Sequence, residues 1–383
     1  MRTRYIFTTI MILILYYAAV YYVGRRLSLS FAPLLDHSLL KFSWMIYSGL
    51  SAAYIAGRVG QISFPGNISR FLIRIGAYWL GFFFYLFLLW CLFDLWILIA
   101  KRLSLLQPDY MPSAAIGAII LLVTTILFCY GLWRARHPQL TRYSIDIRKP
   151  CRKRELHIVV VSDLHLGLLL GRLRLRDLIN RINVLQPDLV LFPGDLLDEN
   201  VGTFLDEEQY KEFYKLNPSA QVFACLGSHE YILGHPEKAL STLRLAGIRV
   251  LQDEVFQTAD GVYIVGRDDL YREKISGNPR KSLEEILAEC DSFQPLILLD
   301  HNPSELSDAL RCGIDLQISG HTHGGQMFPL TLLTKMEFKL NHGYFRQGNF
   351  HAIVSSGYGT WLTPLRIGST PELVSISLKF IKN

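Results

Sequence analysis

The sequence predicts an α/β domain that is preceded by a helical membrane domain. Half of the 383 residues are hydrophobic and the mean hydropathy is +0.24, which indicates that part of the chain faces lipid. All of the long apolar stretches lie before residue 140. After that residue, apolar runs of four to seven residues alternate with amphipathic segments. This is the pattern of strands alternating with helices in a layered domain.

The composition also narrows the classes of partner and site. Residues 1–150 contain 15 Lys and Arg against four acidic residues, whereas the remainder contains 24 against 29. A basic excess beside apolar runs favours membrane lipids as partners, and no nucleic acid partner is expected. The six cysteines form no C-x-x-C pair, so a zinc ribbon or a thioredoxin-like site has no support. Their scatter favours free thiols in a reducing compartment.

Four apolar stretches predict a transmembrane helical domain over residues 1–140. They cover residues 5–23, 39–56, 71–100 and 114–133. A bilayer core of about 30 Å requires about 20 apolar residues in a helix, and each stretch is long enough or nearly so. The second stretch is diluted by serines, so it is either a span or an interfacial segment.

The arginines that flank these stretches predict an orientation. The first stretch has a long apolar core with no small-residue cleavage site after it, which favours an uncleaved anchor over a signal peptide. Four spans place both termini on one side, and most of the flanking arginines then lie in the cytoplasm. We therefore expect a multi-pass protein of the cell (inner) membrane with a cytoplasmic C-terminal half. Three spans would invert this orientation.

Asp94 is the one acidic residue deep within an apolar stretch. An intramembrane carboxylate suggests function by default. A single one is weak evidence for transport, and a role in helix packing or at the interface is the favoured interpretation.

The C-terminal half predicts alternating strands and helices. Residues 141–155 are expected to form a basic linker and a first strand, and residues 156–383 a single domain. Further strands are predicted at 156–162, 189–192, 221–226, 262–265, 296–299, 314–318, 352–355 and 373–378. Helices are predicted at 172–185, 236–246, 282–290 and 304–311.

Carboxylates and histidines follow five of these strands. Asp163 and His165 form a D-x-H pair after the strand at 156–162, and residues two apart on an extended backbone point to the same side. Open α/β sheets bind ligands at the carboxyl ends of their strands. The other groups are Gly194-Asp195-Leu196-Leu197-Asp198, Gly227-Ser228-His229-Glu230, His301 and Gly320-His321-Thr322-His323.

A lone histidine at a strand end is more often a hydrogen-bonded structural residue than a ligand. Five such groups, all offering oxygen or imidazole, are hard to explain by packing alone. Carboxylate and imidazole without thiolate suit Mn, Fe, Zn or Mg, so the sequence predicts a metal site of open identity.

The order of these groups resembles the calcineurin-like metallophosphoesterase superfamily. The segment from Gly320 to Gln326, with Gly357-Tyr358-Gly359-Thr360 and Pro364-Leu365-Arg366, is similar to its branch of small, membrane-anchored bacterial phosphodiesterases. The resemblance spans about residues 156–378 and leaves residues 1–140 outside. It implies a four-layer sandwich of two mixed β-sheets flanked by helices.

The resemblance also implies two divalent metal ions and a role for each motif residue. His229 would act as general acid or orient the phosphate, with Asp198 fixing its tautomer. Two cations about 3.5–4 Å apart activate a water and neutralise phosphoryl charge during in-line displacement. The first metal would be held by Asp163, His165 and His323, the second by Ser228, His301 and His321, and Asp195 would bridge the two.

Ser228 departs from the family pattern, in which Asn is expected. Asn offers a carbonyl to a metal and an amide to phosphate, whereas Ser offers only a shorter hydroxyl. Either a water bridges the gap and leaves a looser second site, or the enzyme is impaired. An active enzyme is favoured because every other motif position is intact.

The predicted function is hydrolysis of a phosphodiester or pyrophosphate bond by a metal-activated water. Membrane attachment favours a lipid-linked phosphoester substrate, and related membrane-associated members hydrolyse UDP-diacylglucosamine. An Arg/Leu stretch at 172–176 could grip headgroups or form an ordinary core-facing helix, and the apolar segment 327–336 could line an acyl-binding rim or be a family-typical loop. The alternatives are a catalytically impaired metal-binding sensor or scaffold and a transporter with an accessory hydrolase domain.

Overall fold

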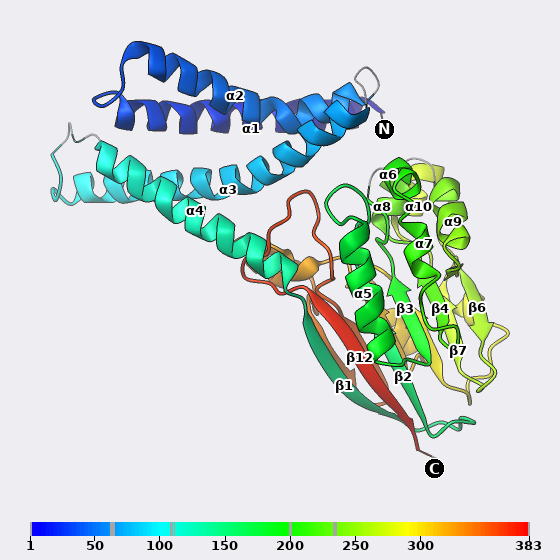
Figure 1. The fold of residues 1–383 in the computed structure, drawn as a ribbon. Coiled ribbons are helices and arrows are strands. Elements are labelled where there is room, and N and C mark those ends of the chain that lie inside the picture. The colour runs from blue at the N-terminus through cyan, green and yellow to red at the C-terminus, as the bar shows by residue number, and fades with distance from the viewer. Residues whose placement is uncertain are drawn as a thin grey trace. The chain divides into compact units, whose positions relative to one another are not determined.

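The computed structural model describes residues 2–61, 66–107, 110, 112–198, 201–232 and 236–381. The chain divides into two compact units, Met1–Leu132 with Leu362–Pro364, and Trp133–Trp361 with Leu365–Asn383. Figure 1 draws the helices of the first unit in blue to cyan and the sheets of the second in green to red.

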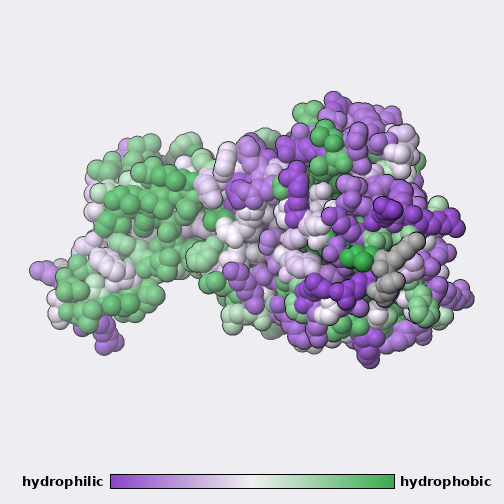
Figure 2. Space-filling model, turned by 90° about the horizontal axis from the view of Figure 1, so that it is seen from below, coloured by the Kyte–Doolittle hydropathy of each residue, from purple (hydrophilic) through white to green (hydrophobic). Residues whose placement is uncertain are grey.

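The first unit consists of long helices. They are α1 (Arg2–Phe31), α2 (His37–Gly60), α3 (Gly66–Arg102) and α4 (Ala114–Arg136). Within the described residues, three segments are long and apolar enough to cross a membrane, namely Phe7–Phe31, Gly66–Arg102 and Ala114–Arg136. Helix α2 is not among them, and about four spans therefore stays a prediction. Figure 2 shows hydrophobic side chains gathered over these helices, and the protein is membrane-associated on this evidence.

Small residues allow α2 and α3 to pack closely. A Cβ on Gly76 would lie 2.3 Å from the backbone nitrogen of Tyr54, and one on Gly57 would lie 2.8 Å from that of Ile73. Membrane helices associate through such backbone approach, because lipid is as apolar as the side chains and provides no hydrophobic driving force.

Asp94 has partners on a neighbouring helix. Its Oδ2 lies 2.5 Å from the guanidinium of Arg26 and accepts a hydrogen bond of 2.5 Å from the hydroxyl of Tyr22. The pair joins α1 to α3 and leaves no net charge between the helices. This arrangement gives the intramembrane carboxylate a structural role.

The second unit is built on two six-stranded sheets. Their orders are β1-β12-β2-β3-β4-β5 and β10-β11-β9-β8-β7-β6. Both are mixed, since β12 runs antiparallel to β2 but parallel to β1, and the pairs β6–β7 and β10–β11 are antiparallel within an otherwise parallel sheet. The strands are β1 (Gln139–Ile147), β2 (Glu155–Val160), β3 (Leu189–Pro193), β4 (Gln221–Cys225), β5 (Arg249–Val250), β6 (Glu254–Gln257), β7 (Tyr263–Gly266), β8 (Leu296–Leu299), β9 (Leu316–Ser319), β10 (Gly343–Gln347), β11 (Phe350–Val354) and β12 (Glu372–Phe380).

Three clusters of buried apolar side chains lie between the layers of the second unit. The central one joins the facing sides of the two sheets, with Ile158 and Leu191 from one and Ile297 and Ile318 from the other. The outer clusters pack helices on each sheet. The predicted fold of two mixed sheets flanked by helices is therefore confirmed. The helices are α5 (Arg172–Val184), α6 (Val201–Asp206), α7 (Tyr210–Phe213), α8 (Ser228–Ile232), α9 (Pro236–Leu245), α10 (Tyr271–Ser276), α11 (Leu283–Leu287), α12 (Leu306–Arg311) and α13 (Leu330–Glu337), with 3₁₀ turns η1 (Pro303–Glu305) and η2 (His323–Gly325).

All of the strands predicted after residue 155 are present, and β1 lies ahead of the basic connection to β2. Strands β5, β6 and β10 were not predicted. All three lie at a sheet edge, are short or largely exposed, and carry no continuous apolar run.

The ion pair in the first unit leads to a stability prediction. Asp94→Leu leaves the Arg26 guanidinium without a counter-charge between helices, so we expect the detergent-solubilised protein to lose about 2 kcal/mol of stability. The double variant Arg26→Leu/Asp94→Leu should recover most of this loss, because no uncompensated charge remains. Thermal unfolding of the three proteins measures the effect. A double variant as unstable as Asp94→Leu would contradict the pairing.

Candidate metal centre

The predicted motif residues all follow carboxyl ends of strands. Asp163 and His165 follow β2, Asp195 and Asp198 follow β3, Ser228 and His229 follow β4, His301 follows β8, and His321 and His323 follow β9. Strands β2, β3 and β4 are parallel in one sheet, and β8 and β9 in the other, so these loops meet at one edge of the sandwich.

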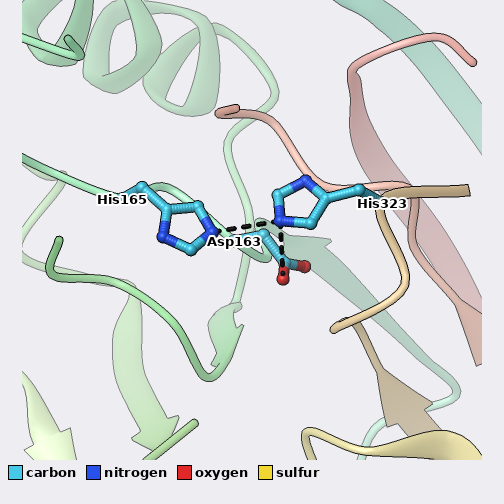
Figure 3. Close-up of side chains that lie close together, drawn as sticks. All are labelled: Asp163, His165 and His323. Atoms are coloured by element: carbon cyan, nitrogen blue, oxygen red, sulfur yellow. Dashed lines mark hydrogen bonds and ion pairs between the residues drawn. The ribbon is translucent and has the colours of Figure 1, made fainter. Parts of the chain in front are cut away.

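The first group of donors is Asp163, His165 and His323 (Figure 3). The Nε2 atoms of the two histidines lie 3.0 Å apart, and Nε2 of His323 lies 3.5 Å from Oδ1 of Asp163. Ser162 and the backbone N–H of His321 donate hydrogen bonds to the Asp163 carboxylate, which fixes its direction. Nδ1 of His165 is buried and has no hydrogen-bond partner in the described part of the chain.

The second group is Asp195, His301 and His321. Nε2 of His301 lies 3.2 Å from Oδ2 of Asp195 and 3.2 Å from Nδ1 of His321. The other ring nitrogen of His301 lies 2.9 Å from the carbonyl oxygen of Pro193 and donates to it. That bond directs Nε2 toward the group, which is how proteins orient a histidine for a metal.

Asp195 belongs to a third group as well, with His165 and His229. Its Oδ2 lies 4.0 Å from Nε2 of His165, and its Oδ1 accepts the backbone N–H of His229 at 2.8 Å. One carboxylate therefore lies between the donors of the first group and those of the second. This is the position that a bridging ligand requires.

The backbone bends sharply at most of these residues. Eleven non-glycine residues of the described chain have positive φ, and five of them are donors with φ between 49° and 71°. The conformation costs roughly 1–2 kcal/mol per residue, and Asp and His tolerate it better than most. Strain concentrated in this way is typical of a functional site. The five donors are Asp163, His165, Asp195, His321 and His323.

Two glycines allow the donor loops to approach one another. A Cβ on Gly320 would lie 1.8 Å from Oγ of Ser162 and 2.3 Å from Oδ2 of Asp163. A Cβ on Gly227 would lie 2.2 Å from Oδ1 of Asp195. No side chain fits at either position without moving a donor.

Burial sets the protonation of the histidines. It lowers the pKa of His165 and His323 well below the usual value and that of His321 to about 4, so their lone pairs are free for a cation at neutral pH. Burial also opposes charge on His301, but the Asp195 carboxylate outweighs it and holds the pKa of His301 well above its usual value. A cation at this position would displace that proton.

The carboxylates differ from one another. Burial raises the pKa of Asp163 to about 6. Burial also acts on Asp195, but the charges of His301 and His229 hold its pKa well below the usual range. Once a cation displaces the proton of His301, the arrangement provides carboxylate oxygen and neutral imidazole donors in two adjoining sets, and these fit two divalent cations.

Glu230 braces the loops that carry the donors. Its buried carboxylate accepts the N–H groups of Asp195 at 3.1 Å, Leu197 at 3.0 Å and Gly227 at 2.8 Å. Burial raises its pKa to about 7. The bonds tie the loop after β3 to the loop after β4 and so fix Asp195 beside His229.

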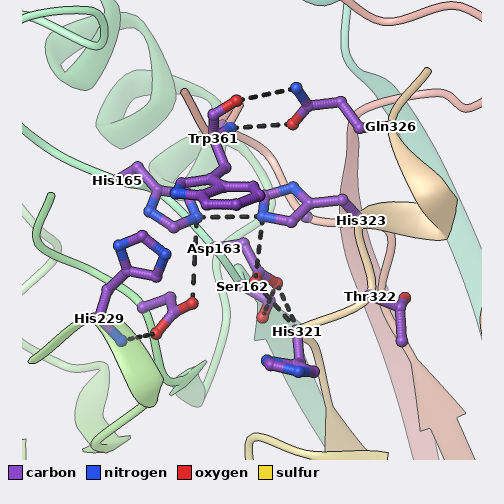
Figure 4. A network of polar contacts seen from close by, with 12 residues as sticks. Ser162, Asp163, His165, His229, His321, Thr322, His323, Gln326 and Trp361 are labelled. Atoms are coloured by element: carbon purple, nitrogen blue, oxygen red, sulfur yellow. Dashed lines mark hydrogen bonds and ion pairs between the residues drawn. The ribbon is translucent and has the colours of Figure 1, made fainter. Parts of the chain in front are cut away.

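His229 lies at the edge of the centre and is 6% exposed. Its ring packs edge-on against His165, with centroids 4.5 Å apart, and against Trp361, with centroids 5.8 Å apart (Figure 4). Trp361 is held by Gln326, whose side-chain amide exchanges two hydrogen bonds of 2.8 and 2.9 Å with the backbone of Trp361. An exposed aromatic ring thus stands beside the predicted acid.

Among the described residues, no hydrogen bond joins the side chains of Asp198 and His229, and Nδ1 of His229 has no partner there. The backbone N–H of Asp198 donates to the carbonyl of Leu166, and its side chain lies beside Gly167. The bond predicted between Asp198 and His229 is absent from this structure, and the role of Asp198 stays a prediction.

Ser228 is buried in the turn that follows β4. It is 4% exposed and stands between Gly227 and His229, both of which contact Asp195. Its place in the turn agrees with that of the Asn expected in the family, whereas its binding to a metal stays a prediction.

Arg366 belongs to the motif Pro364-Leu365-Arg366, and the sequence does not predict which residues it contacts. The fully buried guanidinium donates to the carbonyls of His323 at 2.7 Å and Gly359 at 2.6 Å, and it lies 3.0 Å from Nδ1 of His323. Burial lowers its pKa to about 10. It therefore holds the backbone of His323 and joins the donor turn to the loop that contains Gly359.

Sequence patterns offer weak signals for these supporting residues. Trp361 is the only tryptophan after residue 133, and Arg366 is a lone cation in a mostly uncharged stretch. Neither feature indicates which residues Trp361 or Arg366 contacts, so their roles become evident only in the folded structure.

Comparison with known proteins agrees with the geometry. A family model described as calcineurin-like phosphoesterase matches residues 156–325. A "Transmembrane protein with metallophosphoesterase domain" from Danio rerio is 31% identical over 77% of this chain and 70% of its own length. Metallophosphoesterases described as uncharacterized, from Helicobacter pylori and Aquifex aeolicus, are 32% and 30% identical over 72% and 67% of this chain and over 75% and 98% of their own. The solved structure of a 5′-nucleotidase precursor from Thermus thermophilus aligns at 15% identity over 59% of this chain and 54% of that chain, with a TM-score of 0.37.

The shared position of Asp195 leads to a prediction about metal content. Asp195→Ala should lose both ions and lower phosphoester turnover by about 10³-fold or more, because the carboxylate contacts both groups. Ser228→Ala should retain at least one ion and lose far less turnover. Elemental analysis of the purified variants beside a turnover assay measures both effects. Equal and complete loss in the two variants would exclude a water-bridged site at Ser228.

Arg366 leads to a prediction about the first group. Arg366→Gln should weaken metal binding by about 10–100-fold, which is the usual cost of losing a group that orients a ligand. Arg366→Lys should recover little, because an ammonium cannot contact several acceptors in one plane. The exposed Arg346→Gln is the matched control and should bind metal like the parent protein. Titration with Mn²⁺ measures the affinity, and unchanged binding in Arg366→Gln would contradict the orienting role.

Proposed function

Because this chain belongs to the calcineurin-like metallophosphoesterases, we propose that it is a membrane-anchored two-metal hydrolase of a phosphodiester or pyrophosphate bond. Metal-dependent hydrolysis of a phosphoester follows from the family. The bond type and the lipid-linked substrate are our proposal.

The observation that carries the proposal is the position of Asp195 between two sets of donors. Asp163, His165 and His323 are proposed to hold the first ion, and His301 and His321 the second, with Ser228 completing it through its hydroxyl or a bound water. Asp195 is proposed to contact both. When bound, two divalent ions supply charge that neutralises the phosphoryl group and a water of lowered pKa. Oxygen and imidazole donors without thiolate suit Mn, Fe, Zn or Mg.

His229 is proposed to act on the substrate itself. Its backbone is fixed by Asp195, and its ring lies beside His165 with an unpartnered nitrogen in the described structure. A proton on that imidazole can be given to the departing oxygen or can hydrogen-bond a phosphoryl oxygen. Asp198 is proposed to orient the ring. Trp361, half exposed beside His229, is placed to contact the group attached to the departing oxygen.

The stretch at 172–176 gives little support to headgroup binding. Leu175 is fully buried whereas Leu173 is 78% exposed, and Arg172 and Arg176 both pair with the buried carboxylate of Glu212. These ion pairs favour the interpretation as an ordinary helix of the domain, with Leu175 facing the core. The lipid-linked substrate is supported by membrane attachment instead.

The location is proposed as the cell (inner) membrane, with several spans and a cytoplasmic catalytic unit. The distribution of arginines around the apolar stretches supports this orientation. The number of spans decides it, because removing one crossing moves the catalytic unit to the other side.

A second candidate is a metal-binding sensor at the membrane that has lost turnover. Two observations favour it, the serine at position 228 and the missing bond between His229 and Asp198. The seven intact donor and acid positions favour the hydrolase.

The deciding experiment is turnover by the purified full chain with Mn²⁺. A bis-aryl phosphate, an aryl monophosphate and UDP-diacylglucosamine separate diesterase, monoesterase and pyrophosphatase activity. We expect turnover of the diester or the pyrophosphate, and His229→Ala should lower it by about 10²–10⁴-fold, the usual contribution of a general acid. Two bound metals with no turnover of any substrate would support the sensor.

A further inference from the structure

We propose that α13 docks on the bilayer surface and turns the mouth of the metal centre toward lipid headgroups. The docking surface consists of the exposed side chains of Phe328, Leu332, Leu333 and Met336, together with Lys335. The occupant is the lipid surface of the membrane in which the chain is anchored. The identity of the substrate rests on the proposed function, whereas the docking does not.

The inner face of α13 packs directly on the donor turn. A Cβ on Gly325, in η2, would lie 2.3 Å from Cα of Thr331 and 2.7 Å from Oγ1 of Thr334. Thr322, between the two donor histidines of that turn, donates to the carbonyl of Asn341 just after the helix. Helix α13 is therefore fixed beside His321 and His323.

The outer face of α13 is apolar. Leu332 is 50% exposed, Leu333 60% and Met336 84%, whereas the inward Thr331 is 5% exposed. Position 336 lies four residues after 332 and three after 333, so the Met336 side chain adjoins both leucines on one face. A surface helix of a soluble domain has the reverse pattern, with its apolar stripe facing the core. This inversion indicates that the outer face has an apolar partner.

The charges near that face suit a lipid surface. Lys335 and Lys339 are exposed, and Glu337 is the one acidic residue between 327 and 340. Helices that lie in the membrane interface combine an apolar face with flanking Lys or Arg, which attract anionic lipid.

The connection to the candidate span α4 enters the unit at the same edge as α13. Only His137 and Pro138 separate the end of α4 from the start of β1. Arg134, in the last turn of α4, donates to the hydroxyl of Thr370, and the N–H of Gln139 donates to the carbonyl of Pro371 at 2.9 Å.

The same loop supports α13. The N–H of Phe328 donates to the carbonyl of Ile367 at 2.7 Å, and a Cβ on Gly368 would lie 3.2 Å from Cβ of Phe328 and 3.3 Å from Cγ2 of Thr331. The segment 367–371 thus contacts both the end of α4 and the base of α13. The edge at which the span joins the unit is the edge that carries the inverted helix.

Docking would have a direct consequence for the reaction. Trp361 is linked through Gln326 to the segment that leads into α13, and its ring lies beside His229. A phosphoester held at the headgroup level would enter between the docked helix and Trp361. A substrate with acyl chains could then reach the metals without leaving the bilayer.

The test uses the full chain in lipid nanodiscs and hydrogen–deuterium exchange of segment 327–340. We expect exchange to be several-fold slower in discs that contain anionic phosphatidylglycerol than in discs of phosphatidylcholine alone. Lys335→Glu/Lys339→Glu should abolish the difference, and Leu333→Glu/Met336→Glu should remove the protection in both. Phe293→Glu, 78% exposed before the amino end of β8, is the matched control and should leave the exchange unchanged.

Protection that does not depend on the lipid and persists in Leu333→Glu/Met336→Glu would overturn the proposal. The face would then be covered by protein, either the membrane helices of this chain or a second copy. The exchange measurement requires no turnover, so it stands even if the enzyme is inactive.

A turnover ratio tests the consequence separately. Leu333→Glu/Met336→Glu should lower the rate on UDP-diacylglucosamine in the disc relative to a water-soluble bis-aryl phosphate by about tenfold or more, whereas Phe293→Glu should preserve the ratio. An unchanged ratio in the double variant would contradict entry from the bilayer. Absence of turnover on both substrates in the metal-loaded parent would count against the proposed function and not against the docking.

Discussion

The carboxylate of Asp195 is the contact on which the rest of the centre depends. It lies within reach of donors from the loops after β2, β4, β8 and β9, which belong to two different sheets. A charge in that position requires the surrounding imidazoles, because burial alone would neutralise it. It also requires Gly227, whose missing side chain leaves space for Oδ1, and Glu230, which holds the N–H of Asp195. The sandwich brings these loops to one edge, and Asp195 joins them there.

A second constraint acts at the membrane. Only two residues link the candidate span α4 to β1 of the second unit, and the loop 367–371 joins that link to the base of α13. The pair of Asp94 with Arg26 shows how the helical unit accommodates charge in an apolar setting. Charged groups are thus compensated inside the helical unit, while apolar groups on α13 are left exposed beside the metal centre. Both features are expected of a chain that works at a lipid surface.

Much of the fold could be predicted because its central strands are continuous apolar runs. Strands β3 and β8, and β2 from Ile158 onward, are buried on both faces, so their sequences carry a strong signal. Strands β5, β6 and β10 were missed because they lie at the sheet edges, where one side meets solvent and polar residues are tolerated. The donors could be predicted for a related reason. Their residue types follow strand ends in a fixed order, and strand ends converge.

The sequence by itself determined the sandwich fold with apolar helices ahead of it, and it indicated which residues are candidate donors, since hydrophobic period and motif order are local properties of the chain. The tertiary structure decided which groups meet. It showed that Arg366 holds the carbonyl of His323, that Glu230 braces Asp195, that Nδ1 of His229 has no partner among the described residues, and that α13 carries its apolar face outward. Each of these depends on the direction of a side chain relative to residues far away in the sequence. Such directions are fixed only when the sheets pack and the loops between them are forced to share one edge.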